Sequence, residues 1–164
     1  MSENDSKTPY AVKNPTVELI TEAALSLGHH LDLDRILPEF SALVLEGLEA
    51  DALVVLIDHR DKSKPLHCRY HDGLEGGPEA WNLLPSRLNR RVNEAKGRYL
   101  EAKLDENPLV RQGLLPDVGV YRHAVLQSLY TGTRSLGTII FLRKENRSFT
   151  PHQIEQSSNL ARRL

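Results

Sequence analysis

The chain has 164 residues, which is an ordinary size for one folded domain. Hydrophobic residues make up 40% of it and charged residues 26%, so the composition of the body of the chain is not typical of disorder. The formal net charge of -1 provides no long-range field that would attract nucleic acid or an anionic membrane, and neither is expected as a partner. Because Cys68 is the single cysteine, an intrachain disulfide and a cysteine-rich metal site are excluded, which is typical of a reducing cytoplasm.

The N-terminal part of the chain is predicted to contain a tail followed by a helix. Residues 1–13 are mostly polar and are predicted to be flexible, and residues 14–164 are predicted to form one domain. Pro15 suits the first position of a helix, and Gly28 can end that helix in the left-handed conformation.

A second helix and a buried strand follow. Apolar residues recur at helical spacing from Ile36 to Leu48, although Pro38 must lie early in this helix or bend it. Residues 52–57 are then continuously apolar and rich in β-branched side chains, which predicts a strand buried on both faces.

The next segment alternates in polarity. Leu66, Cys68 and Tyr70 alternate with polar residues, so these three side chains are predicted to share one face of a strand that ends before Gly73. Ser86 can then cap a helix that ends near Gly97.

The last third of the chain predicts two longer strands and a helix. Residues 121–130 and 136–142 are rich in strand-forming residues and are joined by a loop with glycine, which is typical of an antiparallel hairpin. Thr150 and Gln153 have the spacing of a capping box at the start of the final helix. The whole pattern predicts an α+β domain with a mainly antiparallel sheet.

Three segments of this pattern resemble the GAF domain family: residues 31–56, residues 88–97, and residues 135–155 with the sequence Ser135-Leu136-Gly137-Thr138 and the capped helix. The resemblance implies a central antiparallel sheet with the N- and C-terminal helices on one face and a ligand pocket under loops on the other. It also implies a small-molecule sensor that regulates an output module such as a histidine kinase. The alternative is a ligand-free domain for dimerisation and signal relay.

In this family the terminal helices commonly pair between two subunits. Leu27, Leu160 and Leu164 are candidates for such a homodimer seam, but they can equally well cover the sheet. The final helix has no stop signal before Leu164, so we expect it to be truncated here and to continue into a C-terminal output domain of the same chain.

The sequence contains no catalytic motif, so we predict that this chain is not itself an enzyme. Cys68 is the one candidate nucleophile, although a buried, inert thiol fits its alternation better. His67 and His71 lie four residues apart on a predicted strand, about 13 Å, which is too far for one metal ion.

Candidate ligand contacts come from the basic helix and from the aromatic residues. Arg90 and Arg91, with Arg87 and Arg98 nearby, could hold an anion, because guanidinium groups match phosphate and carboxylate; the alternative is a solvated helix face. The remaining candidates are Cys68, Tyr70, Trp81 and Tyr121, which fall in segments that would wall the pocket, or which simply fill the core. Neither the ligand nor a cofactor is identified by the sequence.

Overall fold

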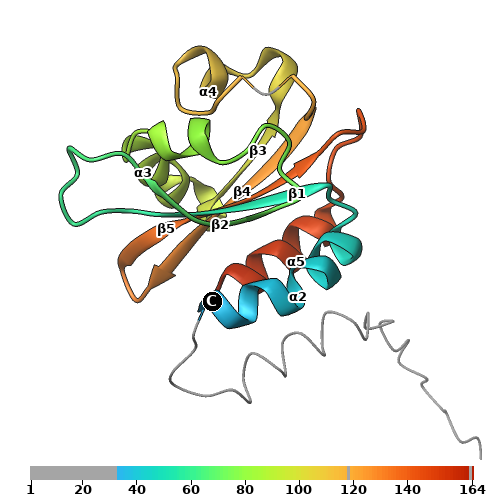
Figure 1. Ribbon diagram of the computed structural model, residues 1–164, viewed down its shortest axis with the longest axis horizontal. Helices are drawn as coiled ribbons and strands as arrows, with labels where there is room; N and C mark the ends of the chain where they lie inside the picture. The colour runs from blue at the N-terminus through green and yellow to red at the C-terminus, as the bar shows by residue number, and fades with distance from the viewer. Residues whose placement is uncertain (1–32, 118, 163) are drawn as a thin grey trace, which may run out of the picture.

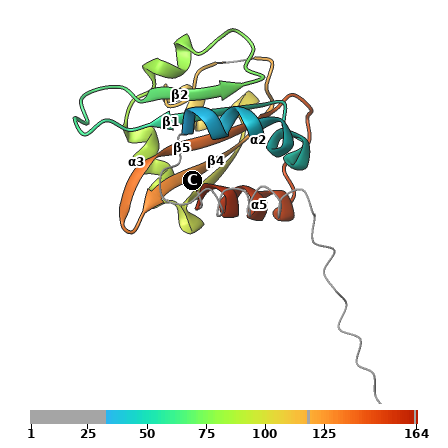
Figure 2. The same ribbon diagram turned by 60° about the horizontal axis from the view of Figure 1, so that its bottom comes forward.

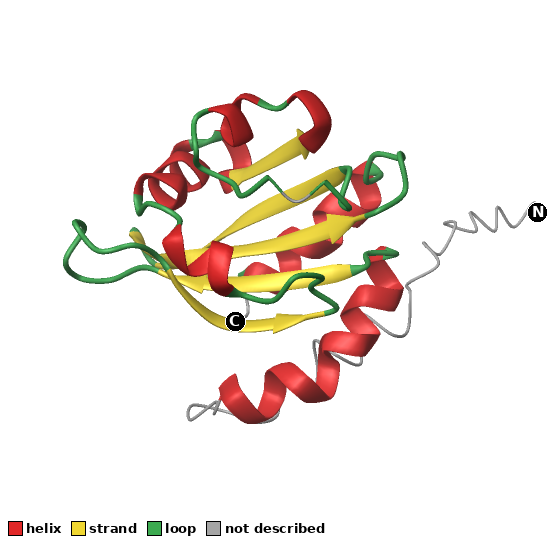
Figure 3. Cartoon of the chain, turned by 45° about the horizontal axis from the view of Figure 1, so that its top comes forward, coloured by secondary structure: helices red, strands yellow, loops and turns green. Residues whose placement is uncertain are grey.

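One antiparallel sheet organises the computed structural model, which describes residues 33–117, 119–162 and 164. The sheet has five strands in the order β2-β1-β5-β4-β3. The strands are β1 (Ala52–Ile57), β2 (His67–Asp72), β3 (Tyr99–Lys103), β4 (His123–Thr131) and β5 (Arg134–Arg143). Helices cover both faces of the sheet (Figure 1, Figure 3), so the predicted α+β class is confirmed. The predicted tail and first helix lie outside the described residues.

The strands form where the sequence is most apolar. The predicted buried strand is β1, which pairs with β2 on one side and β5 on the other, and its first five residues are buried. The predicted hairpin is β4 and β5, whose paired residues include Leu126 opposite Ile140. Both predictions are confirmed. The strands form here because β-branched and aliphatic side chains pack well on a pleated surface that is covered on both faces.

Two helices, α2 (Leu33–Leu48) and α5 (Pro151–Ala161), lie side by side on one face (Figure 1). Their apolar side chains form a cluster with residues of β1, β4 and β5, and Leu160 and Leu164 pack partly buried against it. Pro38 lies inside α2 near its start. Helix α5 extends to Ala161, and the backbone N–H of Leu164 donates to the carbonyl of Leu160 at 3.3 Å. None of the described helices is long and apolar enough to cross a bilayer.

The predicted capping box begins α5. The side chain of Thr150 accepts from the backbone N–H of Gln153 at 3.2 Å, and the side chain of Gln153 accepts from the backbone N–H of Thr150 at 2.9 Å. Two backbone donors that the first turn leaves without a helical partner are satisfied in this way.

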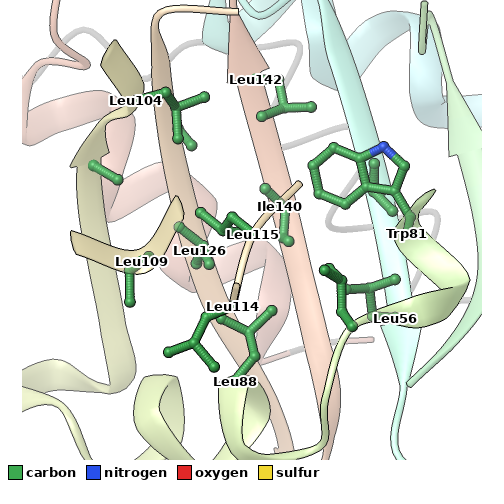
Figure 4. Packing of buried hydrophobic residues seen from close by; sticks show 14 of the residues in the cluster. Leu56, Trp81, Leu88, Leu104, Leu109, Leu114, Leu115, Leu126, Ile140 and Leu142 are labelled. Carbon is green, nitrogen blue, oxygen red and sulfur yellow. The ribbon is translucent and has the colours of Figure 1, made fainter. Parts of the chain in front are cut away.

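The opposite face carries α3 (Arg87–Glu94), α4 (Pro108–Arg111) and the 3-10 turns η1 (Glu79–Leu83), η2 (Lys96–Arg98) and η3 (Leu104–Glu106). Figure 4 shows Trp81, Leu88 and Leu115 packed toward Leu56 and Ile140 of the sheet. The face on which the family resemblance implies a pocket is therefore occupied, over this cluster, by the protein's own side chains.

The predicted alternation in β2 is wrong beyond Cys68. Cys68 pairs with Leu56 and Tyr70 pairs with Val55, so the two partners are adjacent and Arg69 is an extra residue in β2. Such a β-bulge reverses the alternation of the strand. Cys68 consequently packs against the cluster under α3, whereas Tyr70 packs against the cluster under α2 and α5.

The predicted helix after Ser86 is confirmed as α3, but its predicted cap is wrong. The side chain of Ser86 makes no capping hydrogen bond. Its hydroxyl instead donates to the backbone carbonyl of Lys62 at 2.8 Å, which ties the β1–β2 loop to the start of α3.

A buried arginine joins α2 to α5. The side chain of Arg143, at the end of β5, is 1% exposed. Its guanidinium donates to the carbonyls of Leu48 and Glu49 at the end of α2 at 2.8 and 2.9 Å. It also donates to the side chain of Gln153 in α5 at 3.1 Å. Burial lowers the pKa of Arg143, but a guanidinium stays charged at neutral pH.

We expect Arg143→Met to lower the free energy of unfolding by about 3 kcal/mol or more, because several buried carbonyls lose their donor. Urea unfolding followed by circular dichroism measures this loss. Arg122→Gln is the control, since Arg122 is exposed and paired with Asp105, and we expect it to change stability little. A loss for Arg143→Met no larger than that of the control would contradict the role given to the guanidinium.

We also expect Gly137→Ala to lower the free energy of unfolding by about 2 kcal/mol, because overpacking forces the backbone to move. A Cβ atom at Gly137 would lie 2.0 Å from the carbonyl oxygen of Leu56 in β1. Gly119→Ala is the matched control, because a Cβ atom there meets nothing within 4 Å. Equal midpoints of urea unfolding for the two variants would refute this close packing of β1 and β5.

Candidate functional site

The residues predicted to contact a ligand lie in three different places. Trp81 and Tyr121 are each 1% exposed and belong to the apolar cluster under α3 and α4. The hydroxyl of Tyr121 donates to the carbonyl of Gly73 at 3.0 Å and accepts from the backbone N–H of Glu75 at 2.8 Å. In this arrangement both residues serve the core, and a ligand contact by either one stays a prediction.

Tyr70 lies on the face of the sheet that α2 and α5 cover because of the bulge in β2. Its hydroxyl donates to the hydroxyl of Ser41 in α2 at 3.0 Å, and Ser41 donates to the carboxylate of Asp72 at 2.5 Å. Tyr70 therefore fastens α2 to the edge of the sheet and is separated by the sheet from Trp81 and Tyr121.

Cys68 is half-buried in β2. Its backbone N–H donates to the side chain of Asn82 at 2.7 Å, and its thiol donates to the carbonyl of Tyr70 at 3.6 Å. Burial raises the pKa of the Cys68 thiol, although the hydrogen bond with Tyr70 opposes this shift. A raised pKa lowers the fraction of thiolate, which is the reactive form.

Arg90 and Arg91 lie on the exposed side of α3, where Arg90 lines a cleft of about 640 Å³. We call this the basic cleft. Three segments form it: the β1–β2 loop, the helix α3 and the β4–β5 hairpin, which Figure 2 shows at the same end of the sheet. Its cationic side chains are Arg60, Lys62, Arg87, Arg90 and Arg134.

The carboxylate of Asp58, whose side chain is 5% exposed, lies at the floor of the basic cleft. It accepts from Lys62 at 2.5 Å and from the side chain of Asn89 at 3.0 Å. By contrast, the side chains of Arg60, Arg90 and Arg134 make no hydrogen bond or ion pair with any residue in the described part of the chain. The cleft therefore presents guanidinium groups that lack a counter-charge from the described residues.

Asn89 is the centre of the polar network below these cations. Asn89 is 2% exposed. Besides its bond to Asp58, its side-chain oxygen accepts from Ser135 and Thr138 of β5, each at 3.0 Å. A single buried amide thus connects α3 with the end of β1 and with β5. Asn93, which also lines the cleft, accepts from Ser128 of β4 at 3.0 Å.

Adjacent residues of β4 bond to helices on opposite faces of the sheet. Ser128 contacts α3 through Asn93, whereas Gln127 donates to the hydroxyl of Ser157 in α5 at 2.7 Å. Ser158 of α5 donates to the same Gln127 side chain at 3.0 Å. Because successive side chains of a strand point to opposite faces, β4 links the basic cleft to α5 by direct hydrogen bonds.

Arg91 and Arg98 fall outside the basic cleft. Arg91 lines a neighbouring cleft of about 400 Å³ on the other side of α3. The guanidinium of Arg98 lies 3.9 Å above the ring of Tyr130, a cation–π arrangement. The predicted basic cluster is therefore divided, and only Arg87 and Arg90 reach the basic cleft.

Sequence reasoning missed Arg60, Lys62, Arg134 and the buried Asn89. No spacing in the sequence connects them, because the cleft is assembled from a turn, a helix and a hairpin that are far apart along the chain. The one usable signal is the gathering of basic residues in the β1–β2 turn, where Arg60, Lys62 and Lys64 alternate, and this alone is also typical of solvated loops.

No group of His, Cys, Asp or Glu side chains in the described residues could hold a metal ion. His67 and His71 both lie in β2, and the register shift of the bulge falls between them. The ring of His67 lies near that of His59, with 6.5 Å between the ring centroids.

Several solved structures, GAF domains among them, are similar to this chain in fold. The GAF domain of phosphoenolpyruvate-protein phosphotransferase from Acinetobacter aligns with a TM-score of 0.66 and 13% identity, over 92% of this chain and 90% of that chain. Free methionine-R-sulfoxide reductase from Neisseria meningitidis, solved with its substrate, aligns with a TM-score of 0.67 and 14% identity, over 93% and 89%. A domain described as part of a two-component sensor histidine kinase from Sinorhizobium meliloti aligns with a TM-score of 0.55 and 13% identity, over 81% of this chain and 88% of that chain.

The chain therefore has a GAF-like fold, as the resemblance in the sequence predicted. These neighbours differ in their described roles, since one is a reductase and another is a domain of a sensor histidine kinase. No protein-family model and no curated protein matches the sequence.

We expect Cys68 to react with iodoacetamide more slowly in the folded protein than in urea, because burial raises its pKa and shields it. Mass spectrometry of the alkylated chain over a pH series measures both rates.

The pKa of Cys68 is higher in the folded state than in the unfolded state. The stability that the protonated thiol contributes therefore falls as the pH rises above the ordinary thiol range. Cys68→Ser should abolish this part of the pH dependence, and equal alkylation rates in the two states would contradict the burial.

Proposed function

We propose that this chain is a sensory or regulatory domain of a signalling protein, and that it binds a small anionic molecule in the basic cleft. The observation that carries the proposal is the convergence of five cationic side chains from three segments on one cleft. Three of these, Arg60, Arg90 and Arg134, have no partner among the described residues. Neighbouring cations repel one another, and an anion between them would relieve that repulsion.

The size and chemistry of the cleft suit such a ligand. Its volume of about 640 Å³ lies within the usual range for sites of small molecules. Guanidinium groups bind carboxylate and phosphate oxygens through paired N–H donors. The hydroxyls of Ser86 and Ser135 and the amide of Asn93 add polar groups along the wall. The ligand itself stays unidentified.

Occupancy of the cleft can reach α5 through the network already described. A ligand that draws α3 toward the β4–β5 hairpin would act on Asn89 and Asn93, and hence on β4 and β5. Gln127 would pass a displacement of β4 to Ser157 of α5. Under this proposal α2 and α5 carry the signal to an output module, such as a histidine kinase in the same chain, and pair with a second subunit.

We further propose that the chain itself is not a catalyst. The support is the state of Cys68, whose thiol is half-buried and has a raised pKa. A reactive cysteine instead needs a lowered pKa and an electropositive surrounding.

One observation favours a second candidate, a ligand-free domain for dimerisation and relay. Trp81, Leu88 and Ile140 are at most 1% exposed, so the sheet face opposite α2 and α5 is filled over this cluster. In that case α3 serves to hold the sheet rigid, and its arginines are a solvated surface.

The test is the thermal stability of the protein with a panel of small anions that includes phosphate, citrate and mononucleotides, at constant ionic strength. A ligand at a hundred times its dissociation constant should raise the free energy of unfolding by about 2.7 kcal/mol. We expect Arg90→Gln combined with Arg134→Gln to remove this stabilisation. Arg162→Gln, which removes an exposed charge just after α5, is the control and should retain it.

Failure of the whole panel to stabilise the protein would favour the ligand-free alternative. Equal loss of the anion effect in the double variant and in Arg162→Gln would show a non-specific charge effect, and would contradict the assignment of the site.

A further inference from the structure

The helix α3 separates two clefts that share a ridge of arginines. The neighbouring cleft is lined by Arg91, Glu94, Gln112 and Leu114, together with Arg87 and Arg90, which also line the basic cleft. We call it the Gln112 cleft. Arg87 and Arg90 are three residues apart on α3, so their side chains emerge on the same side of the helix. The ridge between the clefts is therefore itself cationic.

Hydrogen bonds to Gln112, just after α4, hold two of the three arginines of the Gln112 cleft in place. Arg87 donates to the backbone carbonyl of Gln112 at 3.0 Å, and Arg91 donates to the side-chain oxygen of Gln112 at 3.3 Å. Arg90 lies between them in sequence, and its guanidinium makes no bond to the described residues. Two guanidinium groups are thus oriented beforehand, which lowers the entropy cost of binding, and the third is free to bind.

We infer that the two clefts form one continuous site for a chain of linked phosphoryl groups, which crosses α3 over Arg87 and Arg90. This inference rests on the proposed function, and it assigns the class of anion that the proposed function left open. A single small anion could occupy one cleft alone. Only a ligand with several linked charges could use the cations of both clefts at once.

The lining favours phosphoryl groups over an aromatic or apolar ligand. Among the described residues that line the two clefts there is no aromatic side chain, and the only aliphatic one is Leu114. Bases of nucleotides are commonly held by stacking on aromatic rings. The side chains present are instead guanidinium, ammonium, amide and hydroxyl donors, which are the groups that bind phosphate oxygens.

The carboxylates in the lining do not prevent this binding. Asp58 is already bonded to Lys62 and Asn89 in the basic cleft. Glu94 is exposed at the end of α3 in the Gln112 cleft. Six cationic side chains line the two clefts together, so positive charge prevails at this end of a chain whose formal net charge is -1.

Titration calorimetry with orthophosphate, pyrophosphate and tripolyphosphate at constant ionic strength tests the inference. We expect affinity to rise with chain length, by at least about tenfold from orthophosphate to tripolyphosphate. Arg91→Gln, which alters only the Gln112 cleft, should lower the affinity for tripolyphosphate by about fivefold or more and leave the affinity for orthophosphate unchanged. Arg134→Gln should lower the affinity for both anions, and Arg162→Gln should lower neither affinity.

A measurement with ATP in the absence of Mg²⁺ distinguishes the two sources of linked phosphoryl groups, which are an inorganic polyphosphate and a nucleotide. Similar affinities for ATP and tripolyphosphate are expected if the protein recognises phosphoryl groups alone. An affinity for ATP more than about tenfold higher would show that the nucleoside is recognised, and would overturn that part of the inference. Urea unfolding of each variant verifies that it is folded.

The results also separate this inference from the proposed function. Equal affinities for orthophosphate and tripolyphosphate, or an unchanged tripolyphosphate affinity in Arg91→Gln, would overturn the two-cleft site while a sensor with a smaller anion survives. Binding of citrate without binding of any phosphate would likewise overturn the two-cleft site and leave the proposed sensor function standing. If no anion binds above the level of the ionic-strength control, the inference and the proposed function fail together.

Discussion

The guanidinium of Arg143 has five N–H groups, and each donates to an oxygen of the surrounding chain. The acceptors are the carbonyls of Leu48 and Glu49 at the end of α2, those of Arg147 and Ser148 in the β5–α5 loop, and the side chain of Gln153 in α5. The same Gln153 completes the capping box with Thr150. The end of one helix, the start of another and the end of β5 are thereby held at one point. Since the C-terminal carbonyls of a helix carry partial negative charge, the cation is well placed there.

The sheet separates this helix pair from the basic cleft, and β4 connects them. Gln127 and Ser128 are adjacent in the chain but bond to α5 and α3 respectively. Any rotation or shift of β4 would change both sets of bonds. Under the proposed function, a change at the cleft would reach α5 without a pocket inside the apolar layer, which is filled by residues such as Trp81 and Leu88. The positions of the cations, and not the volume of an internal cavity, therefore support the proposed ligand site.

The sequence predicted those elements that depend on local rules. The continuous apolar run of β1, the hairpin of β4 and β5, and the capping box of α5 all follow from the preferences of neighbouring residues. Local rules failed where a tertiary contact competed with them. The hydroxyl of Ser86 bonds to Lys62 instead of capping α3, because the β1–β2 loop lies beside it. The extra residue Arg69 in β2 reverses the alternation that placed Tyr70 with Cys68.

The sequence by itself thus determined the class of the fold, the family that it resembles and the basic character of α3, because periodicity, capping and local charge are properties of short segments. Only the tertiary structure decided which residues meet. Arg134 joins Arg60 and Arg90 in one cleft because the β4–β5 hairpin and the β1–β2 loop end beside α3. Asn89, unremarkable in the sequence, became the buried amide that joins these segments. Side chains far apart along the chain converge only through sheet order and register, which no short segment specifies.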